Sequence, residues 1–140
     1  LKYFWTWNSV LWQSIYSKMD MYFHSGVVFE NISELDKVFL EKVNELSIFK
    51  KDKNYKMYCS FTHIFDWWYS AWYYSYTWAE IIVSEILAIF RKEWMYDKAT
   101  ASSFEKLILW AWSIRNASDM FRDFMWRDIS IDAFLEEKWL

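Results

Sequence analysis

The chain has 140 residues, of which 55% are hydrophobic and 25% are charged, with a formal net charge of -3. This length and composition suit one globular domain that buries roughly two-thirds of its unfolded surface. The negative charge argues against a nucleic-acid partner, and no apolar run reaches the roughly 18 residues needed to cross a membrane. The single cysteine, Cys59, cannot form an internal disulfide, which is typical of the cytoplasm, and we expect it to be a small buried residue rather than a nucleophile.

A helix followed by a stop is predicted at the start of the chain. Apolar residues recur with a period close to 3.6 over residues 3–24. The pattern ends at His24, and the only glycine, Gly26, stands where a helix commonly ends. We therefore expect His24 to cap or pack against this helix end instead of binding a metal. The opening Leu1 also leads us to expect a piece cut from a longer protein.

A second, amphipathic helix is predicted over residues 33–46. Ser33 and Asp36 are expected to form a rough capping box at its start. Residues 50–60 follow as a connection, with a short extended piece at 55–60.

The stretch 61–80 gathers tyrosines and tryptophans around one of the two histidines. A buried tyrosine hydroxyl needs a hydrogen-bond partner, so phenols beside a histidine suit a polar ligand better than a core. A helix is predicted from about residue 70 to residue 92. One stripe along it carries Tyr69, Tyr73, Tyr76 and Glu80. The face that we expect to pack against a core carries Ile82, Ile86 and Ile89.

Three further helices complete the prediction. Asp97 is expected to cap a helix that runs through Ile108, Ser118 to open a short helix at 119–125, and residues 131–138 to form a final turn or two. Helices joined by short connections, without repeats or a linker, predict a single all-α segment of about five helices over residues 1–140.

Two motifs connect the chain to a known family. The residues HIF at 63–65 and YSAWYYSYTWAE at 69–80 are close to the pattern H-I-F-x-G-G-Y-x-A-G-Y-Y-S-Y-x-W-A-E. The run FMWRDISIDAFL at 124–135 is close to F-x-G-R-E-P-S-I-D-A-L-L. Both patterns, in this order, belong to the thimet oligopeptidase and oligoendopeptidase family of zinc peptidases, which this chain resembles. The resemblance implies the helical C-terminal portion of a mostly helical catalytic domain.

The zinc-binding motif that such a peptidase needs is not in this sequence. An H-E-x-x-H helix supplies two ligands and a glutamate base, but the chain has only His24 and His63 and no such motif. In the family this motif and the third ligand lie upstream of the matched region. The resemblance therefore implies zinc as the cofactor with its ligands outside this chain, no metal ligand within it, and no activity without the remainder of the catalytic domain. It implies a cytoplasmic zinc metallopeptidase that hydrolyses short peptides. The acidic net charge separately leads us to expect no nucleic-acid or membrane partner.

The resemblance also assigns roles to residues of the tyrosine-rich stretch. The family residues that match His63 and Tyr76 approach the scissile carbonyl, so these two are expected to be catalytic. The residues that match Tyr69 and Tyr73 are expected to bind substrate, Tyr69 by gripping the peptide backbone and Tyr73 as a groove wall. For Tyr73 and Tyr74, packing in a helical core remains an equal alternative.

Other interpretations of the sequence remain open. The chain also fits a stand-alone helical interaction module with exposed aromatic residues, and more weakly an amphipathic protein at a membrane surface. The sequence does not distinguish an endopeptidase from an enzyme that removes C-terminal dipeptides. Glu80 and Glu85 are expected to be a helix-cap partner and a salt-bridge partner, because they point to different faces of the helix and cannot form a catalytic pair.

The tryptophan content is unusual. The chain has twelve tryptophans, one glycine and no proline, where about 7% glycine and about 5% proline are typical. Trp78 matches a tryptophan of the family pattern, but eight others stand where glycine is usual or plausible: Trp67, Trp68, Trp72, Trp94, Trp110, Trp112, Trp126 and Trp139. Our hypothesis is that the gene uses UGA as a glycine codon and that these codons have been translated here as tryptophan. Trp5, Trp7 and Trp12 are further candidates. The missing prolines are not explained by this hypothesis.

Overall fold

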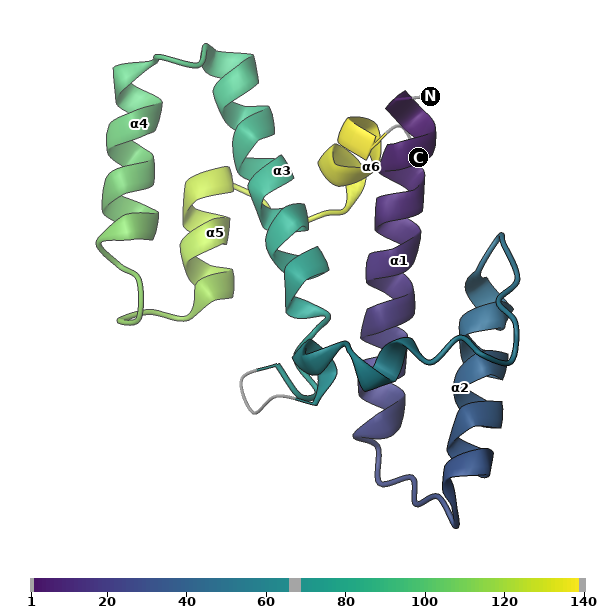
Figure 1. Ribbon diagram of the computed structural model, residues 1–140. Helices are drawn as coiled ribbons and strands as arrows, with labels where there is room; N and C mark the ends of the chain where they lie inside the picture. The colour runs from purple at the N-terminus through teal and green to yellow at the C-terminus, as the bar shows by residue number, and fades with distance from the viewer. Residues whose placement is uncertain (1, 66–68, 139–140) are drawn as a thin grey trace. The chain divides into compact units, whose positions relative to one another are not determined.

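The computed structural model describes residues 2–65 and 69–138, and in these ranges every regular element is a helix. The all-α prediction is thereby confirmed, with six α-helices and no strand in the described ranges (Figure 1). The chain divides into two compact units, Leu1–Trp78 and Ala79–Leu140, which we describe one after the other. None of the described helices combines the length and the apolar character needed to cross a membrane.

The first unit is built on α1 (Lys2–Phe23) and α2 (Ile32–Leu46), which pack against each other (Figure 1). Their contact is apolar, because residues one helical turn apart on each helix face the partner. The buried residues of this core are Ile15, Met19, Phe39 and Val43. The two helices predicted for this part of the chain are confirmed to within about two residues at their ends.

The end of α1 is formed by His24 and Gly26, as predicted. The His24 N–H donates to the Asp20 carbonyl oxygen at 3.1 Å, and the imidazole Nδ1 lies 2.8 Å from the same oxygen. Gly26 has φ of 86°, a left-handed conformation that glycine adopts without a steric cost. The prediction that His24 packs against the helix end is confirmed.

The start of α2 differs from the predicted capping box. Asn31 is the N-cap, and its side chain accepts a hydrogen bond from the Glu34 N–H at 3.0 Å. The Glu34 carboxylate accepts in turn from the Glu30 N–H at 2.8 Å. The box of Ser33 and Asp36 is therefore wrong, because Asn31 already occupies the cap position.

Short helical turns follow α2 instead of an extended piece. They are η1 (Met57–Cys59) and η2 (Thr62–Ile64), so the prediction of extended backbone at 55–60 is wrong. The prediction that Cys59 is buried is also wrong, since its side chain is exposed. The turn directs other side chains of the connection onto the first core, and these are Tyr55, Met57 and Tyr58.

The helix that follows, α3 (Ser75–Glu93), begins later than predicted. Residues 69–74 form turns, and Ala71 has φ of 63°, which a right-handed helix cannot contain. The prediction of one helical stripe of phenols is therefore wrong for Tyr69 and Tyr73, which precede the helix.

The second unit contains most of α3 together with α4 (Lys98–Phe104), η3 (Glu105–Leu109), α5 (Ala117–Met125) and α6 (Asp132–Lys138). Its core consists of Ile108, Met120, Phe121, Phe124 and Met125. The face of α3 that packs against this core carries Ile82, Ile86 and Ile89, as predicted.

Side-chain caps define the starts of α4 and α5. The Asp97 carboxylate accepts from the Thr100 N–H at 2.7 Å, which confirms the predicted cap of α4. The cap of α5 is Asn116 rather than the predicted Ser118, because the Asn116 side chain accepts from the Ser118 N–H at 2.9 Å. The helix consequently begins earlier than the sequence pattern predicts.

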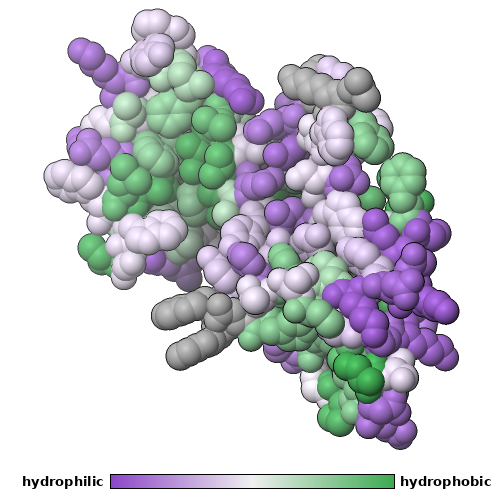
Figure 2. Space-filling model, in the orientation of Figure 1, coloured by the Kyte–Doolittle hydropathy of each residue, from purple (hydrophilic) through white to green (hydrophobic). Residues whose placement is uncertain are grey.

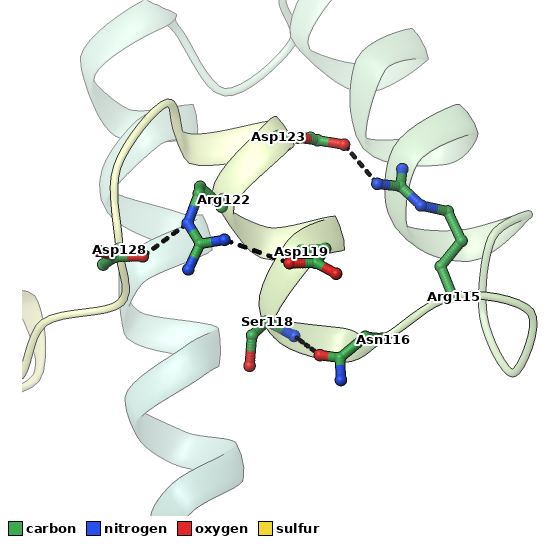
Figure 3. A network of polar contacts seen from close by, with 7 residues as sticks. All are labelled: Arg115, Asn116, Ser118, Asp119, Arg122, Asp123 and Asp128. Atoms are coloured by element: carbon green, nitrogen blue, oxygen red, sulfur yellow. Dashed lines mark hydrogen bonds and ion pairs between the residues drawn. The ribbon is translucent and has the colours of Figure 1, made fainter.

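Exposed ion pairs surround α5 (Figure 3). Arg122 pairs with Asp128 at 2.7 Å and with Asp119 at 3.2 Å, and Arg115 pairs with Asp123 at 2.6 Å. All five side chains are in contact with solvent. Each pair is therefore expected to stabilise the fold by at most about 1 kcal/mol.

One carboxylate of the second unit, that of Glu85, is fully buried. It pairs with Arg127 and accepts from the Ser130 hydroxyl at 3.0 Å. The prediction that Glu85 is a salt-bridge partner is confirmed. Glu80 pairs with Lys138 at 3.2 Å and lies beyond the first turn of α3, so the prediction of a helix-cap partner is wrong.

Replacing Arg127 with glutamine is expected to lower the free energy of unfolding by about 2 kcal/mol, because the buried Glu85 charge then keeps only Ser130 as a partner. The matched control is Arg122→Gln in the exposed network, which should cost less than about 1 kcal/mol. Urea denaturation of both variants measures the difference. Equal losses would mean that the Glu85 charge is compensated by other groups.

Two of the suspected glycine positions have left-handed backbone. Trp94 follows α3 and has φ of 91°, and Trp126 follows α5 and has φ of 59°. The Trp126 N–H donates to the Arg122 carbonyl oxygen at 2.8 Å, as a glycine at a helix C-terminus commonly does. No positive φ occurs at Trp72, Trp110 or Trp112. Lying outside the described residues are Trp67, Trp68 and Trp139.

Candidate active site

The side chain of His63 is exposed, whereas that of the next residue in the chain is buried. It lies in η2, where the next residue, Ile64, is fully buried. The Phe61 ring, which precedes the turn, stacks on the imidazole at 5.3 Å between ring centroids. The apolar contacts of Phe61 and Ile64 therefore fix the turn, while the imidazole itself remains exposed.

The predicted catalytic and substrate-binding rings lie together, although they come from three local structures. The His63 ring centroid lies 5.6 Å from that of Tyr69 and 6.5 Å from that of Tyr76. Tyr69 and Tyr76 stack on each other at 5.2 Å. The turns at 69–74 bring Tyr69 back over the first turn of α3, which a continuous helix would not do.

Tyr73 is the buried member of this cluster, with a relative exposure of 6%. Its ring lies 5.1 Å from Tyr76 and 6.3 Å from His63, and it also contacts Tyr16 of α1 at 5.7 Å. Burial raises the pKa of Tyr73 to about 12, with further contributions from Tyr16 and Tyr76. The phenol is therefore neutral at physiological pH and supports the more exposed rings. Tyr74 is not packed in a core: it is exposed and stacks on Trp72.

The hydroxyl of Tyr76 interacts with Tyr69. A hydrogen bond to Tyr69 raises the pKa of Tyr76, and burial raises this pKa further. A raised pKa means that the Tyr76 phenol stays protonated at physiological pH. Tyr76 consequently keeps an O–H that it can donate to a ligand.

Asp20, which no sequence motif indicates, contacts the tyrosine segment. This residue of α1 is fully buried, and its carboxylate accepts hydrogen bonds from the N–H groups of Ala71 and Tyr73. One signal could have found it: Asp20 directly follows the buried Met19 on the apolar side of the helix. An aspartate at such a position needs polar partners from elsewhere in the chain.

The described residues do not fit a zinc site. In the ranges that the structure covers, no three His, Cys, Asp or Glu side chains come close enough together to hold a metal ion. Among the residues that the structure describes, those whose rings contact the His63 imidazole are phenylalanine and tyrosine. The chemistry of this site is therefore that of hydrogen-bond donors and aromatic surfaces.

The chain is similar to known proteins over most of its length. Residues 2–140 match the model of a family described as "Peptidase family M3". The chain belongs to this peptidase family. The family resemblance that the motifs at 63–80 and 124–135 indicate is thereby confirmed.

The chain is also similar in sequence to several oligopeptidases. "Oligopeptidase A" of Escherichia coli (strain K12) is 35% identical over 77 residues, which cover 55% of this chain and 11% of that protein. "Probable cytosolic oligopeptidase A" of Arabidopsis thaliana is 30% identical over 115 residues, covering 79% of this chain and 16% of that protein. "Saccharolysin" of Saccharomyces cerevisiae is 32% identical over 85 residues, covering 59% and 12%. The chain thus spans less than a fifth of the length of these relatives.

Proposed function

We propose that this chain is the C-terminal part of the catalytic domain of a cytoplasmic zinc metallopeptidase that hydrolyses short peptides. Membership of peptidase family M3 supports the peptidase activity, and the names of the oligopeptidase relatives support short peptides as substrates. The small share of each relative that the chain covers supports the view that most of the catalytic domain lies outside it. Zinc ligands then come from that remainder, and this chain alone is inactive.

The observation that carries the proposal is the convergence of His63, Tyr69 and Tyr76 at the surface of the first unit. In the proposed role, His63 and the Tyr76 hydroxyl face the scissile carbonyl, and Tyr76 donates to its oxygen as negative charge develops. One such donor contributes roughly 3 kcal/mol to transition-state stabilisation. Tyr69 releases the Tyr76 hydroxyl and binds the substrate backbone. Tyr73 forms the buried wall beneath them.

The competing function is a helical interaction module, which the exposed apolar residues favour. Hydrophobic residues lie at the surface of both units on the face shown in Figure 2. Large examples with more than half of their area exposed are Trp72, Trp94, Trp110, Trp112 and Ile114. In the peptidase proposal the rest of the catalytic domain covers part of this surface, whereas in the alternative a separate protein does.

Sequencing the gene upstream of Leu1 separates the two functions. The peptidase proposal expects an in-frame H-E-x-x-H motif there, followed by a third zinc ligand. The complete protein should then hydrolyse short peptides, lose this activity when zinc is removed by a chelator, and regain it when Zn²⁺ is returned. A start codon at residue 1 with no upstream motif would overturn the proposal and favour the interaction module.

A further inference from the structure

The carboxylate of Asp20 connects α1 to the segment that carries the proposed substrate-binding rings. Its Oδ1 accepts from the Ala71 N–H at 2.9 Å, and its Oδ2 accepts from the Tyr73 N–H at 2.8 Å. The His24 Nδ1 lies 2.9 Å from Oδ1. Since Nδ1 also faces the Asp20 carbonyl oxygen, both of its neighbours are acceptors and it carries the proton. Every partner of the buried carboxylate is thus a donor.

The backbone of residues 71–73 points two N–H groups at this carboxylate. Ala71 adopts φ of 63°, a conformation that alanine disfavours, and the turn directs the N–H groups of Ala71 and Tyr73 toward the same point. Backbone N–H groups that converge in this way form a concave anion-binding site. Here the anion is a side chain of the protein itself, so the contact fixes the shape of the segment instead of recruiting a ligand.

The ring cluster depends on this shape. Tyr69 accepts from the Trp72 N–H at 2.8 Å through its carbonyl oxygen, and Tyr73 accepts from the Tyr76 N–H at 3.2 Å in the same way. The segment held by Asp20 therefore leads directly into both stacked tyrosines. A shift of this turn would move the Tyr76 hydroxyl relative to His63, which lies on a different turn.

We propose that Asp20 is a positioning residue for the peptidase reaction, which orients Tyr69, Tyr73 and Tyr76 by binding the backbone N–H groups of residues 71 and 73. This inference rests on the proposed function of the ring cluster. Asp20 does not touch the substrate and acts only through the tyrosine segment. Misplacement of a catalytic group by about 1 Å can cost up to about a hundredfold in rate. Weakening the hydrogen bonds between Asp20 and the tyrosine segment should therefore lower kcat measurably.

The first test is amide hydrogen exchange of the 140-residue chain. Asp20→Asn keeps the shape of the side chain but presents an NH₂ group to one of the two N–H donors, so one hydrogen bond is lost. The Ala71 and Tyr73 amides should exchange at least about tenfold faster in this variant. Glu85→Gln is the matched control, because it also neutralises a fully buried carboxylate but belongs to the second unit and pairs with Arg127 and Ser130. Equal effects of the two variants on these amides would overturn the anchoring role.

The second test is a double-mutant cycle in the complete peptidase. Asp20→Asn should lower kcat by about tenfold with Tyr76 present and by much less in a Tyr76→Phe background, because both changes act through one hydroxyl. Glu85→Gln should leave kcat unchanged at temperatures where the protein is folded. A loss that is the same in both backgrounds would overturn the positioning role. If Tyr76→Phe alone has no effect on kcat, the proposed function of the cluster fails instead.

If Asp20→Asn does not fold, His24→Ala tests the same carboxylate, because His24 is a partly exposed partner of Asp20. This variant keeps both backbone hydrogen bonds and removes only the third donor to the carboxylate. The loss of kcat should then be about twofold to threefold and should again disappear in the Tyr76→Phe background. A loss that persists in that background would contradict the inference.

Discussion

Replacing Tyr76 with phenylalanine is expected to lower the kcat of the complete peptidase by about a hundredfold and to leave KM nearly unchanged. The substitution removes one hydroxyl and keeps the ring that stacks on Tyr69 and contacts Tyr73. In the free protein a hydrogen bond with Tyr69 and burial raise the pKa of that hydroxyl, so it is protonated before substrate binds. A donor that acts mainly on the developing oxyanion should affect kcat and not substrate affinity.

The matched control is Tyr74→Phe, which removes a hydroxyl from an exposed neighbour that stacks on Trp72. It should leave both kinetic parameters unchanged. His63→Ala should resemble Tyr76→Phe, whereas Tyr69→Phe should change kcat and KM together, because in the proposed role Tyr69 binds the substrate backbone and its ring also stacks on Tyr76. An increase of KM at constant kcat for Tyr76→Phe would mean that this residue only binds substrate.

Glycine at positions 94 and 126 is expected to stabilise the chain by about 1–2 kcal/mol at each site. Both tryptophans have left-handed φ, where a side chain collides with the backbone. They are 68% and 92% exposed, so little buried apolar surface is lost when the indole is removed. The midpoint of thermal unfolding should therefore rise by several degrees for Trp94→Gly and for Trp126→Gly.

Trp110→Gly provides the matched control. Trp110 is 71% exposed, but it has φ of -77°, which any residue adopts. Glycine there should be neutral or destabilise the chain by up to about 1 kcal/mol, because it only adds freedom to the unfolded chain. Stabilisation of the same size at all three sites would show that loss of exposed tryptophan, and not backbone conformation, is responsible.

The codons of the gene test the origin of these residues directly. The hypothesis of UGA as a glycine codon expects TGA at the eight suspected positions and TGG at Trp78. Trp78 lies inside α3, where glycine would weaken the helix by about 1 kcal/mol. Trp5, Trp7 and Trp12 also lie inside a helix, α1, so the backbone does not favour glycine at those three. TGG codons at Trp94 and Trp126 would mean that the chain carries tryptophan there despite the strain.

Local pattern alone predicts much of the architecture. The helical period over residues 3–24 and the glycine that follows it define α1, and the cap at Asp97 defines α4. These features depend on neighbours within about one turn of the chain, which is the range that sequence periodicity and capping describe. The motifs at 63–80 and 124–135 likewise identify the family without any structure, because they record residue types in a fixed order.

The arrangement of the candidate site is decided by contacts between distant parts of the chain. The phenol periodicity predicts a helix through Tyr69 and Tyr73, but the segment turns instead, and Ala71 takes a left-handed conformation. Asp20, 51 positions away from Ala71, satisfies the N–H groups that this turn leaves outside a helix. Without this carboxylate the two N–H groups would lie inside the protein without these partners, so the contact stabilises the turn. Tertiary structure therefore decides where the rings meet, while the sequence by itself determines which rings are present.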